Sequence, residues 1–204
     1  MELRGTTVAV LVGQDFEESE AIYPIYRLRE AGAEVIVAAE GGKAVQGKHG
    51  YPLEVDVAFE DLAADDLAGV VIPGGYGPDH VRRSRVAVDL VGEVFERGKV
   101  VAAVCHGAWV LASAGIVKGK RLTSFPSIKD DLVHAGARWV DEEVVVDGDL
   151  VTSREPADLP AFLRAIVERL AAQAAPEPRR RRATASGTAG GGRQKRRPVG
   201  AGRR

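Results

Sequence analysis

The chain has 204 residues, 45% of them hydrophobic and 28% charged, and this composition is typical of a globular protein in water. A single cysteine excludes an internal disulfide and fits a reducing compartment. No apolar run is long enough to span a bilayer, and the first residues lack the pattern of a secretory signal. We therefore expect a cytoplasmic protein without membrane contact.

The formal net charge of −1 combines two segments of opposite sign. Residues 176–204 carry ten Lys or Arg and a single acid, while the rest of the chain carries 18 basic and 28 acidic residues. The basic segment has one large aliphatic residue, Val199, so it cannot bury enough apolar surface to offset the entropy of ordering. We predict one folded domain over residues 1–175 and a disordered basic tail over residues 176–204.

The first part of the chain predicts a β-α-β unit. The apolar run 7–12 is typical of a buried strand, a polar turn leads into a helix that ends near Ala31-Gly32, and residues 33–39 form a second strand. Pro24 lies inside that helix, where we expect it to cause a kink. Because strand, helix and strand alternate, we expect the two strands to be parallel with a right-handed crossover.

The following segments continue this alternation. A hairpin around residues 47–50 precedes a buried strand that ends in a glycine turn at Gly74-Gly75. An Asp147-Gly148 turn predicts a second hairpin. Together the elements predict an α/β fold, a three-layer sandwich with a mainly parallel sheet. The further expected elements are helices at 78–82, 85–97, 127–135 and 156–175, and strands at 69–75, 99–104, 121–124, 138–140 and 144–153.

The segment 99–113 contains the strongest signal for chemistry. An apolar β-branched run leads to Cys105, and apolar residues at helical spacing follow it. The small residues Ala103 and Gly107 flank the cysteine, as a sharp strand-to-helix turn requires. This spacing indicates a nucleophile elbow with a helix N-terminus near the sulfur, which stabilises the reactive thiolate. A small buried core cysteine is the alternative interpretation.

Other residues near this turn are candidates for supporting roles. Glu17 follows the first strand and faces the crevice where α/β folds bind ligands, although an exposed acid at a helix start is the commoner role. Adjacent helical residues do not face each other, so we expect His106 to orient or polarise rather than to act as the direct base. Gly75 and Gly107 are candidates for oxyanion or substrate contacts, and a plain tight turn is an equal alternative for Gly75.

Several short motifs, taken together, resemble the PfpI family of intracellular cysteine peptidases and deglycases, within the class I glutamine amidotransferase-like superfamily. The resemblance extends from Thr6 to Leu170 and leaves out the tail. It implies a flavodoxin-like sandwich, a Cys-His pair at the elbow and a homo-oligomer with the site near the interface. The motifs that carry it are Ala103-Val104-Cys105-His106-Gly107, Ile72-Pro73-Gly74-Gly75, Gly47-Lys48-His49-Gly50, Thr123-Ser124, Ile128-Lys129-Asp130-Asp131, Ala135-Gly136-Ala137 and Pro156-Ala157-Asp158-Leu159.

The resemblance also implies two acids at the site. A glutamate beside the sulfur matches Glu17, which, when protonated, donates a hydrogen bond to the thiolate. An acid contributed by a neighbouring subunit matches Asp79. This chain departs from the family peptidase, which has glutamate at position 79 and, where this chain has Phe125, a tyrosine with its hydroxyl. Both departures favour chemistry on small substrates over proteolysis.

These residues favour a cysteine-dependent hydrolase that acts on peptides or on carbonyl compounds such as methylglyoxal and its protein adducts, with Cys105 as nucleophile beside His106 and an acid. A non-enzymatic redox or stress sensor, which responds through oxidation of Cys105, is the alternative. A glutamine amidotransferase is less favoured because no His-x-Glu pair follows the cysteine. No His, Cys, Asp and Glu cluster has metal-ligand spacing, so we expect neither a metal nor a cofactor.

The charge of the tail permits non-specific contact with nucleic acid, but no aromatic residue is interleaved for stacking on bases, and we favour a solvated extension. Deleting residues 176–204 is expected to leave turnover unchanged and to flatten the salt dependence of DNA binding, measured by fluorescence anisotropy at several salt concentrations. A collapse of turnover or solubility after the deletion would contradict this interpretation.

Overall fold

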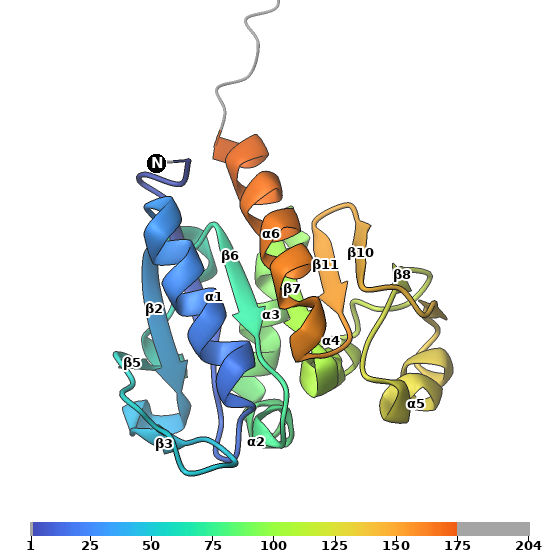
Figure 1. Cartoon of the computed structure of the whole chain (residues 1–204), viewed down its shortest axis with the longest axis horizontal. Coiled ribbons are helices and arrows are strands. Elements are labelled where there is room, and N and C mark those ends of the chain that lie inside the picture. The colour runs from blue at the N-terminus through green and yellow to red at the C-terminus, as the bar shows by residue number, and fades with distance from the viewer. Residues whose placement is uncertain (1, 175–204) are drawn as a thin grey trace, which may run out of the picture.

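A seven-stranded sheet runs through the computed structural model, which describes residues 2–174 (Figure 1). Five of the six neighbouring strand pairs are parallel, and the edge strand β10 is antiparallel to β11. The mainly parallel sheet is therefore confirmed. In spatial order the strands are β10 (Val144–Asp147), β11 (Leu150–Ser153), β7 (Val100–Val104), β6 (Gly69–Ile72), β1 (Thr7–Leu11), β2 (Glu34–Ala39) and β5 (Val57–Ala58).

Helices cover both faces of this sheet and complete three layers, as Figure 1 shows. Since both faces are covered, the central strands are apolar on both sides, and all five residues of β7 are buried. The expected flavodoxin-like sandwich is confirmed. On one face lie α1 (Glu18–Ala31) and α6 (Leu159–Ala174), and on the other lie α2 (Gly77–Arg83), α3 (Arg85–Glu96) and α4 (Ala108–Ser113).

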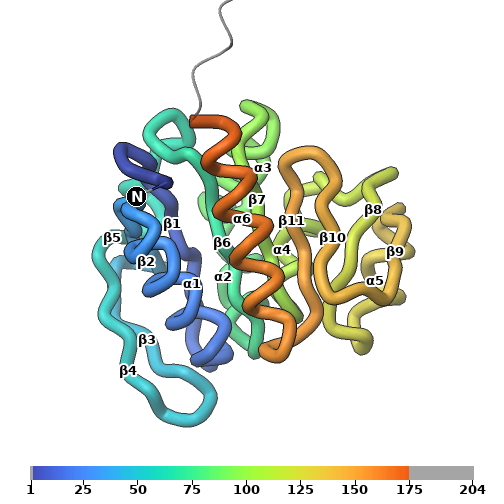
Figure 2. Tube along the Cα trace, turned by 45° about the horizontal axis from the view of Figure 1, so that its top comes forward, coloured from blue at the N-terminus to red at the C-terminus, as the bar shows by residue number. Residues whose placement is uncertain are grey.

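The expected hairpin after β2 is present as β3 (Val45–Gln46) and β4 (Pro52–Leu53), which pair antiparallel and project below the sheet in Figure 2. Its turn is anchored to the loop after β1, because the Lys48 N–H donates to the Phe16 carbonyl at 3.0 Å. A hairpin that decorates the sheet thus brings its tip to the carboxyl end of β1.

The structure corrects one expected strand. Residues 138–140 were expected to finish the central sheet, but β9 (Arg138–Trp139) instead pairs in parallel with β8 (Arg121–Leu122) in a separate two-stranded sheet. The reason is local hydrogen bonding, since the Arg138 N–H donates to the Lys120 carbonyl and the Val140 N–H to the Leu122 carbonyl. The short helix α5 (Lys129–His134) joins these two strands beside β10 (Figure 2).

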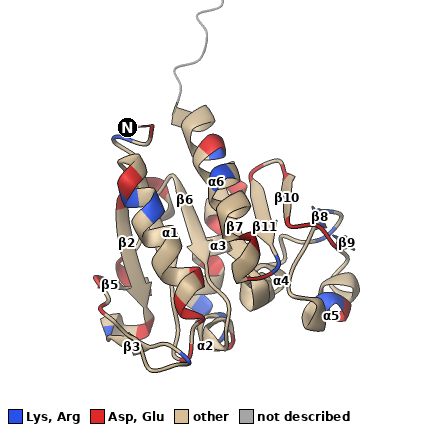
Figure 3. Cartoon of the chain, in the orientation of Figure 1, with Lys and Arg blue, Asp and Glu red and all other residues tan. Residues whose placement is uncertain are grey.

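Helix α1 runs without interruption through Pro24, and its buried stripe includes an acid, Glu20. Charged residues of both signs are spread over the helices and loops in Figure 3, with acidic residues at the start of α1. Within residues 2–174 no helix combines the length and apolarity needed to cross a membrane. The predicted disordered tail, 176–204, lies outside the described residues.

Candidate active site

Cys105 lies where β7 ends and a 3-10 turn, Cys105–Gly107, leads into α4. Its φ of 60° is in the left-handed region, which a residue with a side chain rarely adopts and which the surrounding packing must hold. Gly107 permits the turn, because a Cβ at that position would clash with the carbonyl oxygen of Ile72 at the end of β6. The strand, sharp turn and helix of a nucleophile elbow are present.

His106 contacts the cysteine directly, with its Nδ1 3.2 Å from the Cys105 sulfur. The expectation that adjacent residues would not face each other is wrong here, because Cys105 has a positive φ and begins a 3-10 turn rather than an α-helix. Burial, and secondarily the charge of Lys48, lower the pKa of His106. The imidazole is therefore neutral at pH 7 and able to accept a proton.

Glu20 is the carboxyl that lies against Cys105. It is fully buried, and its Oε2 accepts the Gly74 N–H at 2.8 Å. A Cβ added to Gly74 would lie 2.5 Å from Glu20 Oε2 and 3.0 Å from the sulfur, which shows how closely the two groups approach. Burial raises the pKa of Glu20 to about 8, with a further contribution from the charge of Glu17, so Glu20 holds its proton at pH 7.

The position beside the sulfur was expected for Glu17, and the structure corrects this placement. Glu17 immediately precedes α1, and its carboxylate pairs with Lys48 and accepts a hydrogen bond from Ser19 Oγ at 3.1 Å. Glu20, one turn further along, faces the end of the sheet instead. The ion pair with Glu17 raises the pKa of Lys48, which stays an ammonium group at the cavity wall.

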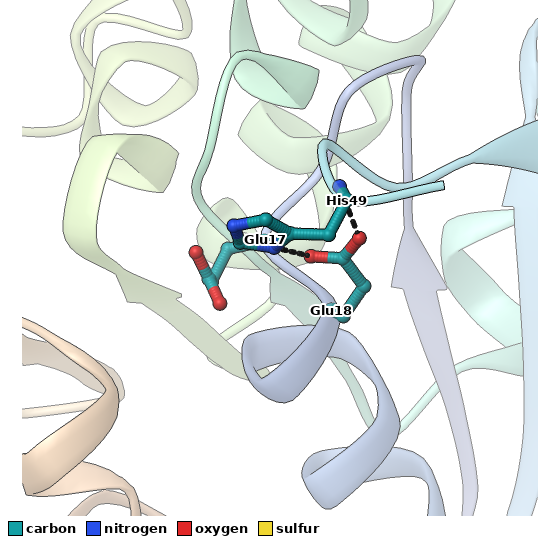
Figure 4. Close-up of side chains that lie close together, drawn as sticks. All are labelled: Glu17, Glu18 and His49. Atoms are coloured by element: carbon teal, nitrogen blue, oxygen red, sulfur yellow. Dashed lines mark hydrogen bonds and ion pairs between the residues drawn. The ribbon is translucent and has the colours of Figure 1, made fainter. Parts of the chain in front are cut away.

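Figure 4 shows Glu17, Glu18 and His49 close together, with candidate ligand atoms within 4.8 Å of one another. Each carboxylate already has a partner from the hairpin turn. Glu18 accepts hydrogen bonds from the backbone N–H of His49 and interacts with its Nδ1 at 2.9 Å, and Glu17 pairs with Lys48. We interpret the group as the network that fixes this turn over the site.

The resting cysteine is held as a thiol. Burial raises the pKa of Cys105 to about 12, and the negative charge of an ionised Glu20 adds to this effect. The backbone N–H groups of Gly75 and His106 act in the opposite direction, because both donate toward the sulfur. Protonation of Glu20 removes the opposing charge and supplies another donor, so the thiolate is best supported when Glu20 is neutral.

A cavity of about 260 Å³ opens onto the cysteine, whose residue surface is only 8% exposed. The volume accommodates a small molecule or one side chain rather than a folded substrate. Gly75 belongs to its wall, whereas Gly107 packs behind the turn, so a substrate contact by Gly107 stays a prediction. The lining residues are Glu17, Glu20, Lys48, Gly75, Tyr76, Cys105, His106, Phe125 and Pro156.

Comparison with known proteins identifies the family of this chain. The family model described as the DJ-1/PfpI family matches residues 6–169. The chain belongs to the DJ-1/PfpI family. A deglycase of Pyrococcus abyssi is 48% identical over 163 residues, which are 80% of this chain and 98% of that protein. The protein/nucleic acid deglycase 2 of Escherichia coli is 40% identical over 168 residues, 81% of this chain and 98% of its own length.

The crystal structure of Drosophila melanogaster DJ-1β superposes on this chain with a TM-score of 0.77 at 37% sequence identity. The aligned region is 81% of this chain and 90% of the Drosophila chain. The family expected from the sequence motifs is thus confirmed. The similarity supports the flavodoxin-like fold described above.

In this DJ-1/PfpI chain Asp79 does not join the other candidates. It is exposed on α2 and lines a different cavity, beside Arg82 and Trp109. A contribution from a neighbouring copy therefore stays a prediction. Two residues at the site were not predicted from the sequence, Glu20 and Ser127, and Ser127 Oγ lies 3.1 Å from His106 Nε2. Glu20 had a visible signal, an acid on the apolar stripe of α1, while no local pattern indicated Ser127.

Glutamine substitutions at and near α1 test which acid raises the pKa of Cys105 and so lowers its reactivity. Above pH 8, Glu20→Gln removes a charge that raises the pKa of Cys105, so alkylation by iodoacetamide is expected to accelerate about tenfold. Near pH 6, where Glu20 is protonated, the variant and the parent are expected to react at similar rates. The exposed acid Glu30 provides the matched control, and Glu30→Gln is expected to leave the pH profile unchanged. Glu17→Gln removes a charge that adds to the raised pKa of Glu20, so it is expected to shift the profile less than Glu20→Gln does. A larger shift in Glu17→Gln than in Glu20→Gln would contradict the assignment.

Proposed function

We propose that this protein is a cysteine-dependent hydrolase of the deglycase type, which acts on small carbonyl compounds and on their adducts with proteins. The observation that carries the proposal is the arrangement at the elbow. The sulfur of Cys105 faces a small cavity, His106 Nδ1 lies 3.2 Å away, and the N–H groups of Gly75 and His106 point at the sulfur. The deglycase names of the relatives support the same chemistry.

The first step transfers the thiol proton to the neutral imidazole of His106, and the thiolate then adds to the carbonyl carbon of the substrate. Negative charge passes from sulfur to the carbonyl oxygen as the carbon–sulfur bond forms. The N–H groups that face the sulfur are placed to stabilise this charge, in the manner of an oxyanion hole. With an acyl substrate, His106 then returns the proton to the leaving amine or oxygen, and water hydrolyses the thioester. With methylglyoxal, the proton returns to the carbonyl oxygen to give a hemithioacetal, and a proton then moves from the hemithioacetal carbon to the neighbouring ketone carbon. Water hydrolyses the resulting thioester to a hydroxy acid and the free thiol.

Glu20 supports the thiolate as a neutral donor, and we assign Glu17 with Lys48 to the cavity wall, where the ammonium group can contact a polar substrate. The cavity of about 260 Å³ favours small carbonyl substrates over extended peptides. We further propose a cytoplasmic homo-oligomer in which Asp79 of a neighbouring copy approaches the site. The exposed position of this acid on α2 supports an intersubunit role.

Assays of the full chain on methylglyoxal, on methylglyoxal-treated N-acetylarginine and on casein separate the candidate activities. We expect turnover of the first two substrates, weak or no cleavage of casein, and a loss of at least about 1,000-fold in Cys105→Ser. The exposed-surface control His134→Ala is expected to retain full activity.

Two results would contradict the proposal. Full activity of Cys105→Ser would exclude the cysteine as nucleophile. No turnover of any substrate, together with stoichiometric oxidation of Cys105 to sulfinic acid by mild peroxide, would favour the redox sensor.

A further inference from the structure

Both ring nitrogens of His106 have a partner within the same chain. Nδ1 lies 3.2 Å from the Cys105 sulfur, and Nε2 lies 3.1 Å from the Ser127 hydroxyl oxygen. The three groups form a continuous line from the buried cysteine to the surface. Asp79 of the same chain lines a separate cavity, so Ser127 is the side chain that this chain itself supplies to Nε2.

The direction of proton transfer determines which nitrogen of the neutral His106 ring must carry the hydrogen. His106 can accept the thiol proton at Nδ1 only when that nitrogen has no hydrogen, so the neutral ring must carry its hydrogen on Nε2. In the resting site the Cys105 thiol donates to Nδ1, so Nε2 carries the hydrogen and the Ser127 oxygen is placed to accept it. After Nδ1 has taken up the proton, both ring nitrogens carry hydrogen and the Ser127 hydroxyl can only accept. The Ser127 hydroxyl therefore stabilises the tautomer that the base requires and the imidazolium that forms from it.

The ring is also restrained by two aromatic side chains. Phe125 stacks on His106 with centroids 5.2 Å apart and an interplanar angle of 26°, and Trp109 meets it edge-on at 5.0 Å and 67°. With its face and edge covered, the imidazole has little freedom to turn away from the sulfur. These contacts set the plane of the ring, but neither determines which nitrogen is protonated.

The backbone holds Ser127 in place opposite Nε2. It lies in a 3-10 turn, Pro126–Ile128, between a proline with a restricted φ and the fully buried side chain of Ile128. The Phe125 N–H donates to the Cys105 carbonyl at 3.3 Å, which ties this segment to the elbow. An exposed serine is thus presented from a backbone position anchored at both sides.

We propose that Ser127 is a positioning residue, which holds His106 in the tautomer whose Nδ1 accepts the Cys105 proton, so that one chain contains a complete Cys105–His106–Ser127 relay. This inference rests on the proposed function, because it assigns Ser127 a role in activating the same nucleophile.

The test compares Ser127→Ala, Ser127→Thr and Asp79→Ala in the full chain. Ser127→Ala is expected to lower kcat on methylglyoxal about tenfold with KM within twofold, because a hydrogen bond to a group that becomes charged is lost. Ser127→Thr keeps the hydroxyl and is expected to recover most of kcat. Asp79→Ala is expected to have the smaller effect of the two alanine variants.

The ¹⁵N chemical shifts of the imidazole report the tautomer without any turnover, and only four histidines need assignment. The parent chain and Ser127→Thr are expected to show His106 protonated at Nε2, and Ser127→Ala a mixture of tautomers. An unchanged tautomer and unchanged kcat in Ser127→Ala would overturn the inference, as would a large loss in Asp79→Ala alone. Because the shifts are read without substrate, they test the inference even if the proposed activity is wrong.

Discussion

The burial of Glu20 against Cys105 is the constraint on which the rest of the site depends. An uncharged carboxyl can be enclosed at the end of the sheet beside a sulfur, whereas a carboxylate there is strongly disfavoured. Glu20 Oε2 accepts the Gly74 N–H, and within the described residues the buried Oε1 has no hydrogen-bond partner. We infer that the carboxyl proton resides on Oε1, because Oε2 already accepts a hydrogen bond.

This arrangement couples the site to the stability of the fold. The pKa of Glu20 in the folded chain lies above its ordinary value of 4.5. As the pH rises, the Glu20 carboxyl therefore loses its proton at a lower pH in the unfolded chain than in the folded chain. The contribution of Glu20 to stability is therefore fully present below pH 4.5 and is lost as the pH rises to about 8. This shift in pKa corresponds to a decrease of about 4 to 5 kcal/mol in the free energy of unfolding between low and high pH. That decrease is a large share of the stability of a typical domain.

Two glycines, Gly74 and Gly107, allow the backbone to approach closely enough for the turn at Cys105 to form. Gly74 leaves room for both Glu20 and the sulfur, and Gly107 lets the turn lie against the end of β6. The positive φ of Cys105 lifts its side chain into the cavity and, by the same distortion, brings the His106 ring back toward it. The strained backbone at Cys105 thus positions the side chains of both Cys105 and His106.

The layers of this fold were predictable because strands and helices differ in apolar periodicity, and Cys105 was predictable because the small residues around it permit only a tight turn. Glu20 carried a readable signal on the buried face of α1, but the place of Glu17 directly after the first strand and the family resemblance favoured Glu17. Ser127 and Lys48 reach the site through contacts across 21 and 31 residues, and no local pattern encodes such contacts. The two-residue strand at Arg138 was misplaced because pairing partners of very short strands depend on tertiary context.

A titration of the Glu20 carboxyl carbon by ¹³C NMR, assigned by its disappearance in Glu20→Gln, tests the central claim most directly. This carbon is expected to titrate with a midpoint near 8, well above the midpoints of the exposed glutamates in the same spectrum. A midpoint near the ordinary value of 4.5 would mean that Glu20 is a carboxylate at pH 7, and the role assigned to it beside Cys105 would be wrong.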